Sequence, residues 1–95
     1  MAARPLTPDE RSALLADHPD WSGTGDMMER TIAFADFAEA MDFVNRVALA
    51  AQAADHHPDI DIRWNRVTLR LTTHAAGALT DLDRGLAETI DGFLA

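Results

Sequence analysis

Three of the chain's four histidines lie where they could share one site. His56 and His57 are adjacent, and His74 lies beyond an expected β-hairpin. Imidazole has an unperturbed pKa of about 6.5, so it is the side chain that most readily takes or gives a proton near neutral pH. Three imidazoles around one small substrate could serve as acid, base and polar anchor, so the sequence points first to proton-transfer chemistry.

The same stretch contains a set of possible metal ligands: Asp55, His56, His57, Asp59 and His74. Neighbouring residues in an extended chain point to opposite sides, and Pro58 biases His57 towards extended geometry, so the histidine pair cannot easily chelate one ion. The helical HExxH spacing is also absent. We therefore expect no metal.

Two further interpretations remain open on the residues alone. Nucleophilic catalysis would need an activated hydroxyl, and Ser12 and Ser22 lie in no recognisable nucleophile motif. A purely structural role is the other: His74 would end a hairpin, and Thr80 and Asp83 would form a capping box at the start of a helix. Capping explains Asp83 without any ligand, although it leaves one carboxylate oxygen free.

The composition indicates one compact, acidic domain. The chain has 95 residues, of which 47% are hydrophobic, and this suffices for one core. Its formal net charge is −8, so the phosphate backbone of a nucleic acid would be repelled, and no basic cluster reverses this locally. We therefore expect no direct binding of nucleic acid.

No apolar run approaches the ~20 residues needed to cross a bilayer. The start, Met-Ala-Ala-Arg-Pro, lacks the apolar stretch of a signal peptide. Because the chain has no cysteine, disulfides, thiolate nucleophiles and zinc sites built on cysteine are excluded. These features predict a cytoplasmic protein that does not associate with membranes.

The first half of the chain is expected to alternate helix and strand. A capping box at Thr7–Glu10, with Pro8 at the first helical position, predicts a helix that ends at His18-Pro19. Residues 31–34 form a plausible strand, and there is room for another short strand near Trp21. The longest helix is predicted from about residue 36 to just before the histidine pair.

Apolar residues recur along this long helix at three- and four-residue steps and form one broad face. They are Phe37, Ala40, Met41, Val44, Val47, Ala48 and Ala51. The helix therefore places the histidine pair at a junction between helix and strand.

Two half-buried strands should follow, because apolar and polar residues alternate over 60–64 and over 67–71. Trp64 is expected on the same face as Ile60 and Ile62, with Asn65–Arg66 as the turn. The opposite sheet face would carry polar residues: Arg63, Thr68 and Arg70.

A last helix is predicted from Thr80, where Asp83 completes a capping box. Its expected buried stripe is Leu82, Leu86, Ile90 and Phe93. Helices and strands in this order favour a single α+β domain, in which a small antiparallel sheet is covered on one face by helices.

An ordered set of residues spans the candidate site: His56-His57-Pro58, Trp64, His74 and Asp83, with five, nine and eight residues between its successive parts. This set resembles the signature of the pterin-4a-carbinolamine dehydratases. The resemblance covers nearly the whole chain, since further residues fall in familiar order. They are Leu6-Thr7, Trp21, Phe34, Phe37, Ala40, Phe43, Thr73–Gly77 and Leu79-Thr80.

The resemblance implies a two-layer sandwich of a four-stranded antiparallel sheet with three α-helices on one face, spanning residues 1–95 as one domain. It also implies a homodimer or homotetramer. The implied reaction is dehydration of a 4a-hydroxy-tetrahydropterin to the quinonoid dihydropterin, in support of phenylalanine hydroxylation. Pterin is then the substrate, and no cofactor or metal is needed. A dehydratase-like binding or assembly module without turnover is the alternative.

The resemblance further implies that the three histidines carry out the chemistry. His56 and His74 would be the main acid–base pair, and His57 would bind and orient the pterin. Three other residues are expected to bind the substrate: Asp55, Thr73 and Asp83. Trp64 would shape the pocket wall or the sheet core.

Two positions depart from the family pattern. Gln52 lies four residues before the first histidine, where an ionisable residue is usual, and a neutral amide cannot raise imidazole basicity as a carboxylate does. Gly77-Ala78 replaces a frequent pair of glycines, which would restrict the loop if its second position needed positive φ. These departures concern rate and substrate preference more than the type of reaction.

Overall fold

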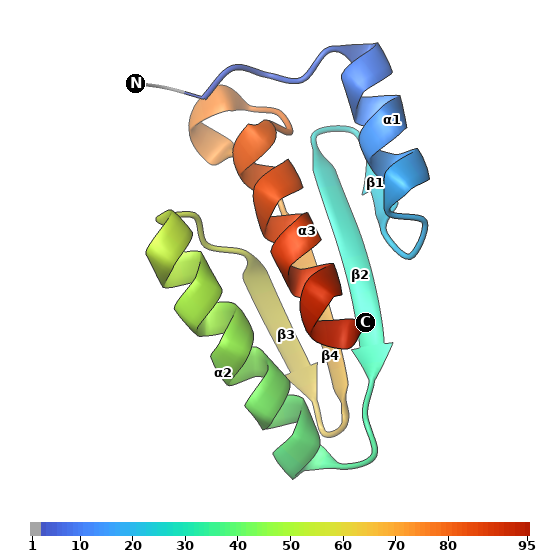
Figure 1. The fold of residues 1–95 in the computed structure, drawn as a ribbon, viewed down its shortest axis with the longest axis vertical. Coiled ribbons are helices and arrows are strands. Elements are labelled where there is room, and N and C mark those ends of the chain that lie inside the picture. The colour runs from blue at the N-terminus through green and yellow to red at the C-terminus, as the bar shows by residue number, and fades with distance from the viewer. Residues whose placement is uncertain (1–2) are drawn as a thin grey trace.

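The computed structural model describes residues 3–95, so Met1 and Ala2, the first residues of the start examined for a signal peptide, lie outside the described part. The elements are α1 (Pro8–Asp17), β1 (Ser22–Thr24), β2 (Met27–Ala33), α2 (Phe37–Ala54), β3 (Asp59–Arg63), β4 (Arg66–Leu71), a short 3-10 helix η1 (His74–Ala76) and α3 (Asp81–Leu94). All neighbouring strands are antiparallel, in the order β1-β2-β4-β3. The three α-helices lie against one face of this sheet (Figure 1), which confirms the predicted α+β architecture.

Each α-helix begins directly after the capping residue that the sequence indicates. Thr7 accepts a hydrogen bond from the backbone N–H of Glu10 (3.1 Å), and the Glu10 carboxylate accepts one from the backbone N–H of Thr7 (2.9 Å). Asp36 caps α2, which ends where Asp55 adopts a left-handed φ of 50°. The end of α2 therefore places His56 at the predicted junction between helix and strand.

The core lies between the helices and the covered face of the sheet. The central strands β2 and β4 supply completely buried Met28, Val67, Leu69 and Leu71, against which Val47 of α2 and Ile90 of α3 pack. Burying one such side chain contributes roughly 1.5–3 kcal/mol. Among the helices of the described residues, none is both long and apolar enough to cross a membrane.

Three residues on the predicted apolar faces of the helices are exposed. Phe37, the first residue of α2, remains 50% exposed, Leu82 on α3 is 39% exposed, and Ala48 on α2 also faces solvent. In the first turn of α3 the inward position is taken instead by Asp83, which is completely buried. A carboxylate can occupy this position because hydrogen-bond donors surround it, a requirement that an apolar periodicity does not reveal.

The β3–β4 hairpin turns one residue earlier than predicted. Arg63 pairs with Arg66, so Trp64 and Asn65 form the turn, and Trp64 is 64% exposed with a φ of 51°. Asn65 anchors the turn to the end of β2, because its side-chain amide donates to the Phe34 carbonyl at 2.8 Å. Trp64 therefore lies on the surface and not in the sheet core.

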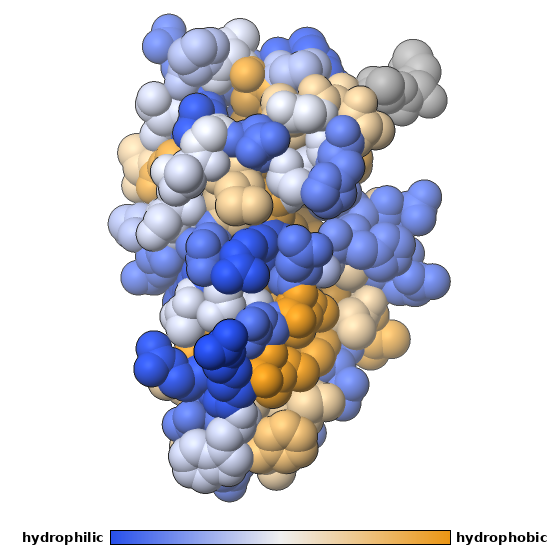
Figure 2. All heavy atoms as spheres, turned by 180° about the vertical axis from the view of Figure 1, so that it is seen from behind, coloured by the Kyte–Doolittle hydropathy of each residue, from blue (hydrophilic) through white to orange (hydrophobic). Residues whose placement is uncertain are grey.

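The uncovered face of the sheet is polar, as predicted. Cross-strand neighbours on this face include Arg70 between Asp59 and Glu29, and Thr68 beside Thr31. In Figure 2, which views the molecule from behind, hydrophilic residues run across the middle and a hydrophobic patch lies to one side. The apolar residues of the sheet therefore face the helices, and its polar residues face outward.

One carboxylate, that of Asp91 on α3, joins the N-terminal part of the chain to the C-terminal helix. It accepts hydrogen bonds from the Trp21 indole (2.8 Å) and the Arg30 guanidinium (2.7 Å), and it bonds the His18 ring at 2.6 Å. Burial raises the pKa of Asp91, but the hydrogen bonds from Trp21, His18 and Arg30 outweigh it, so the pKa lies below its ordinary value. The network therefore stabilises the fold while Asp91 is ionised.

Replacing Asp91→Ala should lower the free energy of unfolding by about 2 kcal/mol, because three donors lose their shared acceptor. A group whose pKa is lower in the folded state stabilises the fold above its unfolded pKa, so this contribution should begin to fall below about pH 4 and be lost as the pH drops through the lower pKa of the folded state. Urea unfolding followed by tryptophan fluorescence at pH 7 and pH 3 measures both effects. Glu88→Gln, an exposed site on the same helix, is the control, and equal losses at both pH values would contradict the account.

Candidate active site

His56 is held in the structure by a carboxylate from the other end of the candidate segment. Its side chain is buried, and its Nε2 lies 2.6 Å from Oδ1 of Asp83. His56 follows the end of α2, whereas Asp83 lies in the first turn of α3. The two elements are brought together at this end of the molecule, so the structure joins two of the predicted site residues directly.

The second oxygen of Asp83 is also fully used. Oδ2 accepts hydrogen bonds from the Thr73 hydroxyl (2.8 Å) and from the backbone N–H of Thr80 (2.9 Å). The latter completes the predicted capping box at the start of α3. A completely buried carboxylate is tolerated here because both of its oxygens have donors.

This arrangement fixes the tautomer of the His56 ring. An ionised carboxylate has only acceptors, so the short contact requires a hydrogen on His56 Nε2. The neutral ring then carries its lone pair on Nδ1, which can take a proton and later return it. Asp83 orients the His56 ring, as the aspartate orients the histidine in a Ser-His-Asp triad.

His57 points to a different partner, although it is adjacent in sequence. It is exposed, and its Nε2 lies 2.8 Å from Oε1 of Gln52, which lies on α2. Gln52 is the neutral departure from the family pattern, and its amide oxygen orients the His57 ring without adding charge. Sequence reasoning noted Gln52 but did not find this contact, which its spacing before the histidine pair could have suggested.

His74 is exposed and begins η1, directly after the buried Thr73. The hydroxyl of Thr73 bonds Asp83, so the backbone next to His74 is tied to the carboxylate that holds His56. Gly77 ends this turn with a φ of 62°, and Ala78 is not among the residues at positive φ. Alanine therefore fits the position that departs from the family pattern.

Asp55 is exposed and ends α2, where its backbone N–H donates to the carbonyl groups of Ala51 and Gln52. No hydrogen bond of its carboxylate to a histidine is present among the described residues. Direct binding of substrate by Asp55, Thr73 and Asp83 stays a prediction. The observed contacts of Thr73 and Asp83 support the ring of His56 instead.

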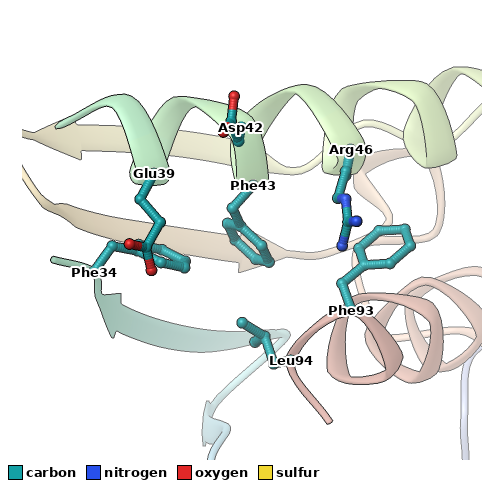
Figure 3. Close-up of a pocket in the computed structure, with 7 residues that line it drawn as sticks. All are labelled: Phe34, Glu39, Asp42, Phe43, Arg46, Phe93 and Leu94. Atoms are coloured by element: carbon teal, nitrogen blue, oxygen red, sulfur yellow. The ribbon is translucent and has the colours of Figure 1, made fainter. Parts of the chain in front are cut away.

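Two hollows of the described residues lie where α2 and α3 meet, and no histidine lines either of them. The first, of about 430 Å³, lies where α2 meets the end of α3 and is lined by Phe34, Glu39, Asp42, Phe43, Arg46, Phe93 and Leu94. Figure 3 shows Glu39 and Arg46 on either side of Phe43, with Asp42 pointing away. A second hollow, of about 420 Å³, lies between the end of α2 and the start of α3.

None of these hollows is lined by a histidine of the predicted site. Of the three predicted catalytic residues, His57 and His74 are exposed and His56 is buried, and a shared pocket for them stays a prediction. No group of three His, Asp or Glu side chains among residues 3–95 is placed to hold a metal ion.

Replacing Asp83→Ala should lower the free energy of unfolding by about 3 kcal/mol, because buried donors on His56, Thr73 and Thr80 all lose their acceptor. Asp81→Ala is the matched control: Asp81 is exposed in the same helical turn and pairs only with Arg84, at 3.3 Å. Urea unfolding of both variants measures the difference. Similar losses in the two variants would show that the buried network contributes little.

Comparisons with known proteins identify the family of the chain. Residues 4–93 match the family model described as pterin 4 alpha carbinolamine dehydratase. Provisionally named pterin-4-alpha-carbinolamine dehydratases from Mycobacteroides abscessus and Chloroflexus aurantiacus are 50% and 52% identical to this chain, each over 90% of it and 92% of their own length.

Two solved structures share the fold. The crystal structure of a transcriptional coactivator/pterin dehydratase from Brucella melitensis superposes with a TM-score of 0.92 at 30% identity, over 97% of this chain and 100% of the other. A pterin dehydratase-like RuBisCO assembly factor of the alpha-carboxysome gives a TM-score of 0.63 at 22% identity, over 76% and 83%. The sequence, the fold and the relatives agree, and the chain belongs to the pterin-4a-carbinolamine dehydratase family.

Proposed function

We propose that this protein dehydrates 4a-hydroxy-tetrahydropterins to quinonoid dihydropterins by general acid–base catalysis with histidine and without a metal. The observation that carries the proposal is the buried His56 ring, whose Nε2 lies 2.6 Å from the Asp83 carboxylate and is held by it in one tautomer. Membership of the family supplies the substrate class.

The proposed reaction needs only proton transfers. The N5 lone pair of the carbinolamine expels the oxygen on C4a as the C4a–O bond breaks and a C4a–N5 double bond forms. An acid gives a proton to the departing hydroxyl, which leaves as water, and a base takes the proton from N5. One proton is given and one is taken, so the histidines need no outside oxidant, reductant or co-reactant.

The observed hydrogen bonds favour a division of roles among the three imidazoles. His56 exchanges its proton through Nδ1, because Nε2 is occupied by Asp83. His74 acts as its partner from the loop that follows Thr73. His57, oriented by Gln52, binds and orients the pterin.

The biological setting follows from the same proposal. The product pterin belongs to cofactor recycling for an aromatic amino acid hydroxylase, such as a phenylalanine hydroxylase, in the cytoplasm. The protein acts as a homodimer or homotetramer, without nucleic acid or membrane. Pterin is the substrate of the proposed reaction, and no separate cofactor is needed.

A binding or assembly module without turnover is the second candidate. The Brucella melitensis neighbour is also named a transcriptional coactivator, and the more distant neighbour is described as a RuBisCO assembly factor. Against this candidate, the present chain retains the three histidines of the signature. Turnover by the purified protein separates the two functions.

Replacing His56→Ala or His74→Ala should lower kcat by about 10²–10⁴, the range that one positioned acid or base contributes. The measurement supplies chemically generated 4a-hydroxy-tetrahydropterin and follows the ultraviolet absorbance of the quinonoid product. His18→Asn changes the chain's fourth histidine, which lies in the Asp91 network, and should leave the rate unchanged.

Circular dichroism of each variant confirms that the fold is intact. Equal rates with and without the wild-type protein would contradict the enzymatic proposal and favour the binding module. Activity that requires added metal, or that chelators remove, would contradict the metal-free mechanism.

A further inference from the structure

Thr80, which sequence analysis identified only as a helix cap, is completely buried beside the site. Its hydroxyl oxygen lies 2.7 Å from that of Thr73, whereas its capping bond from the Leu82 backbone N–H is longer, at 3.2 Å. The shorter contact leads away from α3 and towards the loop before His74. A helix cap needs only the bond from the Leu82 N–H, so capping does not explain the shorter contact with Thr73.

The direction of each hydrogen bond in this cluster can be derived. Thr73 has one hydroxyl hydrogen, and the Asp83 carboxylate, which can only accept, uses it at 2.8 Å. The hydrogen between the two threonines must therefore come from Thr80. The oxygen of Thr80 in turn accepts the Leu82 N–H.

The result is a one-way chain of donors: Leu82 N–H to Thr80, Thr80 to Thr73, and Thr73 to Asp83. Hydrogen bonds in such a chain polarise and strengthen one another. Because the Thr73 hydroxyl holds Oδ2 together with the Thr80 backbone N–H, rotation of the Asp83 carboxylate is restricted and Oδ1 stays directed at His56.

We propose that Thr80 is a positioning residue for the reaction: acting through the Thr73 hydroxyl and Asp83, it fixes the tautomer and orientation of the His56 ring. The effect on rate rests on the proposed function, whereas the effect on the ring does not. Thr80 does not touch the substrate. Its loss should therefore lower kcat and leave KM unchanged.

The test compares Thr80→Val, which removes the hydroxyl but keeps the shape, with Thr80→Ser, which retains it. Thr73→Val breaks the same chain without removing a helix cap. Thr7→Val is the matched control, because Thr7 caps α1 in an equivalent capping box and its hydroxyl accepts from the Glu10 backbone N–H, outside the chain of donors that leads to Asp83. It separates loss of a cap from loss of the chain of donors.

The first readout needs no substrate. In proton NMR of the free protein, the Nε2–H of His56 should resonate far downfield, because it is buried and bonded to a carboxylate at 2.6 Å. This resonance should move upfield and exchange faster with water in Thr80→Val and Thr73→Val. It should stay in place in Thr80→Ser and Thr7→Val.

The second readout is the rate of pterin dehydration. We expect kcat to fall about 10-fold in Thr73→Val and about 3-fold in Thr80→Val, a fraction of the 10²–10⁴ given by a positioned acid or base. KM should not change, and Thr80→Ser should restore kcat.

An unshifted His56 resonance in both valine variants would overturn the proposal, whatever the rates, and would leave Thr80 as a helix cap alone. A kcat that falls equally in Thr80→Val and Thr7→Val would overturn it as well. If the wild-type protein does not turn over the pterin, the proposed function fails, but the shift of the resonance still decides whether Thr80 positions His56.

Discussion

The bond between His56 and Asp83 is the interaction on which the rest of the site depends. It joins the end of α2 to the first turn of α3 at 2.6 Å and occurs between buried groups. A buried carboxylate is costly unless donors surround it, and here the donors come from the ring, a loop hydroxyl and a helix N-terminus. The same contacts that make Asp83 tolerable in the core thus hold one imidazole in a defined orientation.

Most of the fold could be predicted from the sequence, because helix caps and strand alternation depend on residues that are close together in the chain. Capping boxes at Thr7 and Thr80 start α1 and α3, and alternation gives both strands of the hairpin. The errors occurred where a tertiary contact decides. The Asn65 side chain donates to the Phe34 carbonyl, which fixes the hairpin turn at Trp64 and Asn65 and leaves Trp64 exposed. In the first turn of α3, Asp83 takes the buried position among its hydrogen-bond donors, and Leu82 is exposed.

The candidate site shows the same division between local pattern and tertiary contact. The order of the histidines predicts which residues form the site, but it does not show their surroundings. The partner of His56 is distant in sequence, whereas the partner of His57 lies on the preceding helix. His56 is buried against Asp83, whereas His57 is turned to Gln52 on the surface. Two adjacent residues in extended chain must point apart, so one histidine faces the core and the other faces solvent. The hydroxyl of Thr80 was visible in the sequence only as a cap, since nothing in the order of residues places it beside Thr73.

A structure of the protein bound to a dihydropterin, an unreactive relative of the proposed product, tests the central claim most directly. The account predicts that the C4a–N5 edge of the ring lies within hydrogen-bond distance of the imidazoles of His56 and His74, with His57 on the polar edge. A pterin bound instead in the hollow lined by Phe34, Phe43 and Phe93, away from the histidines, would contradict it.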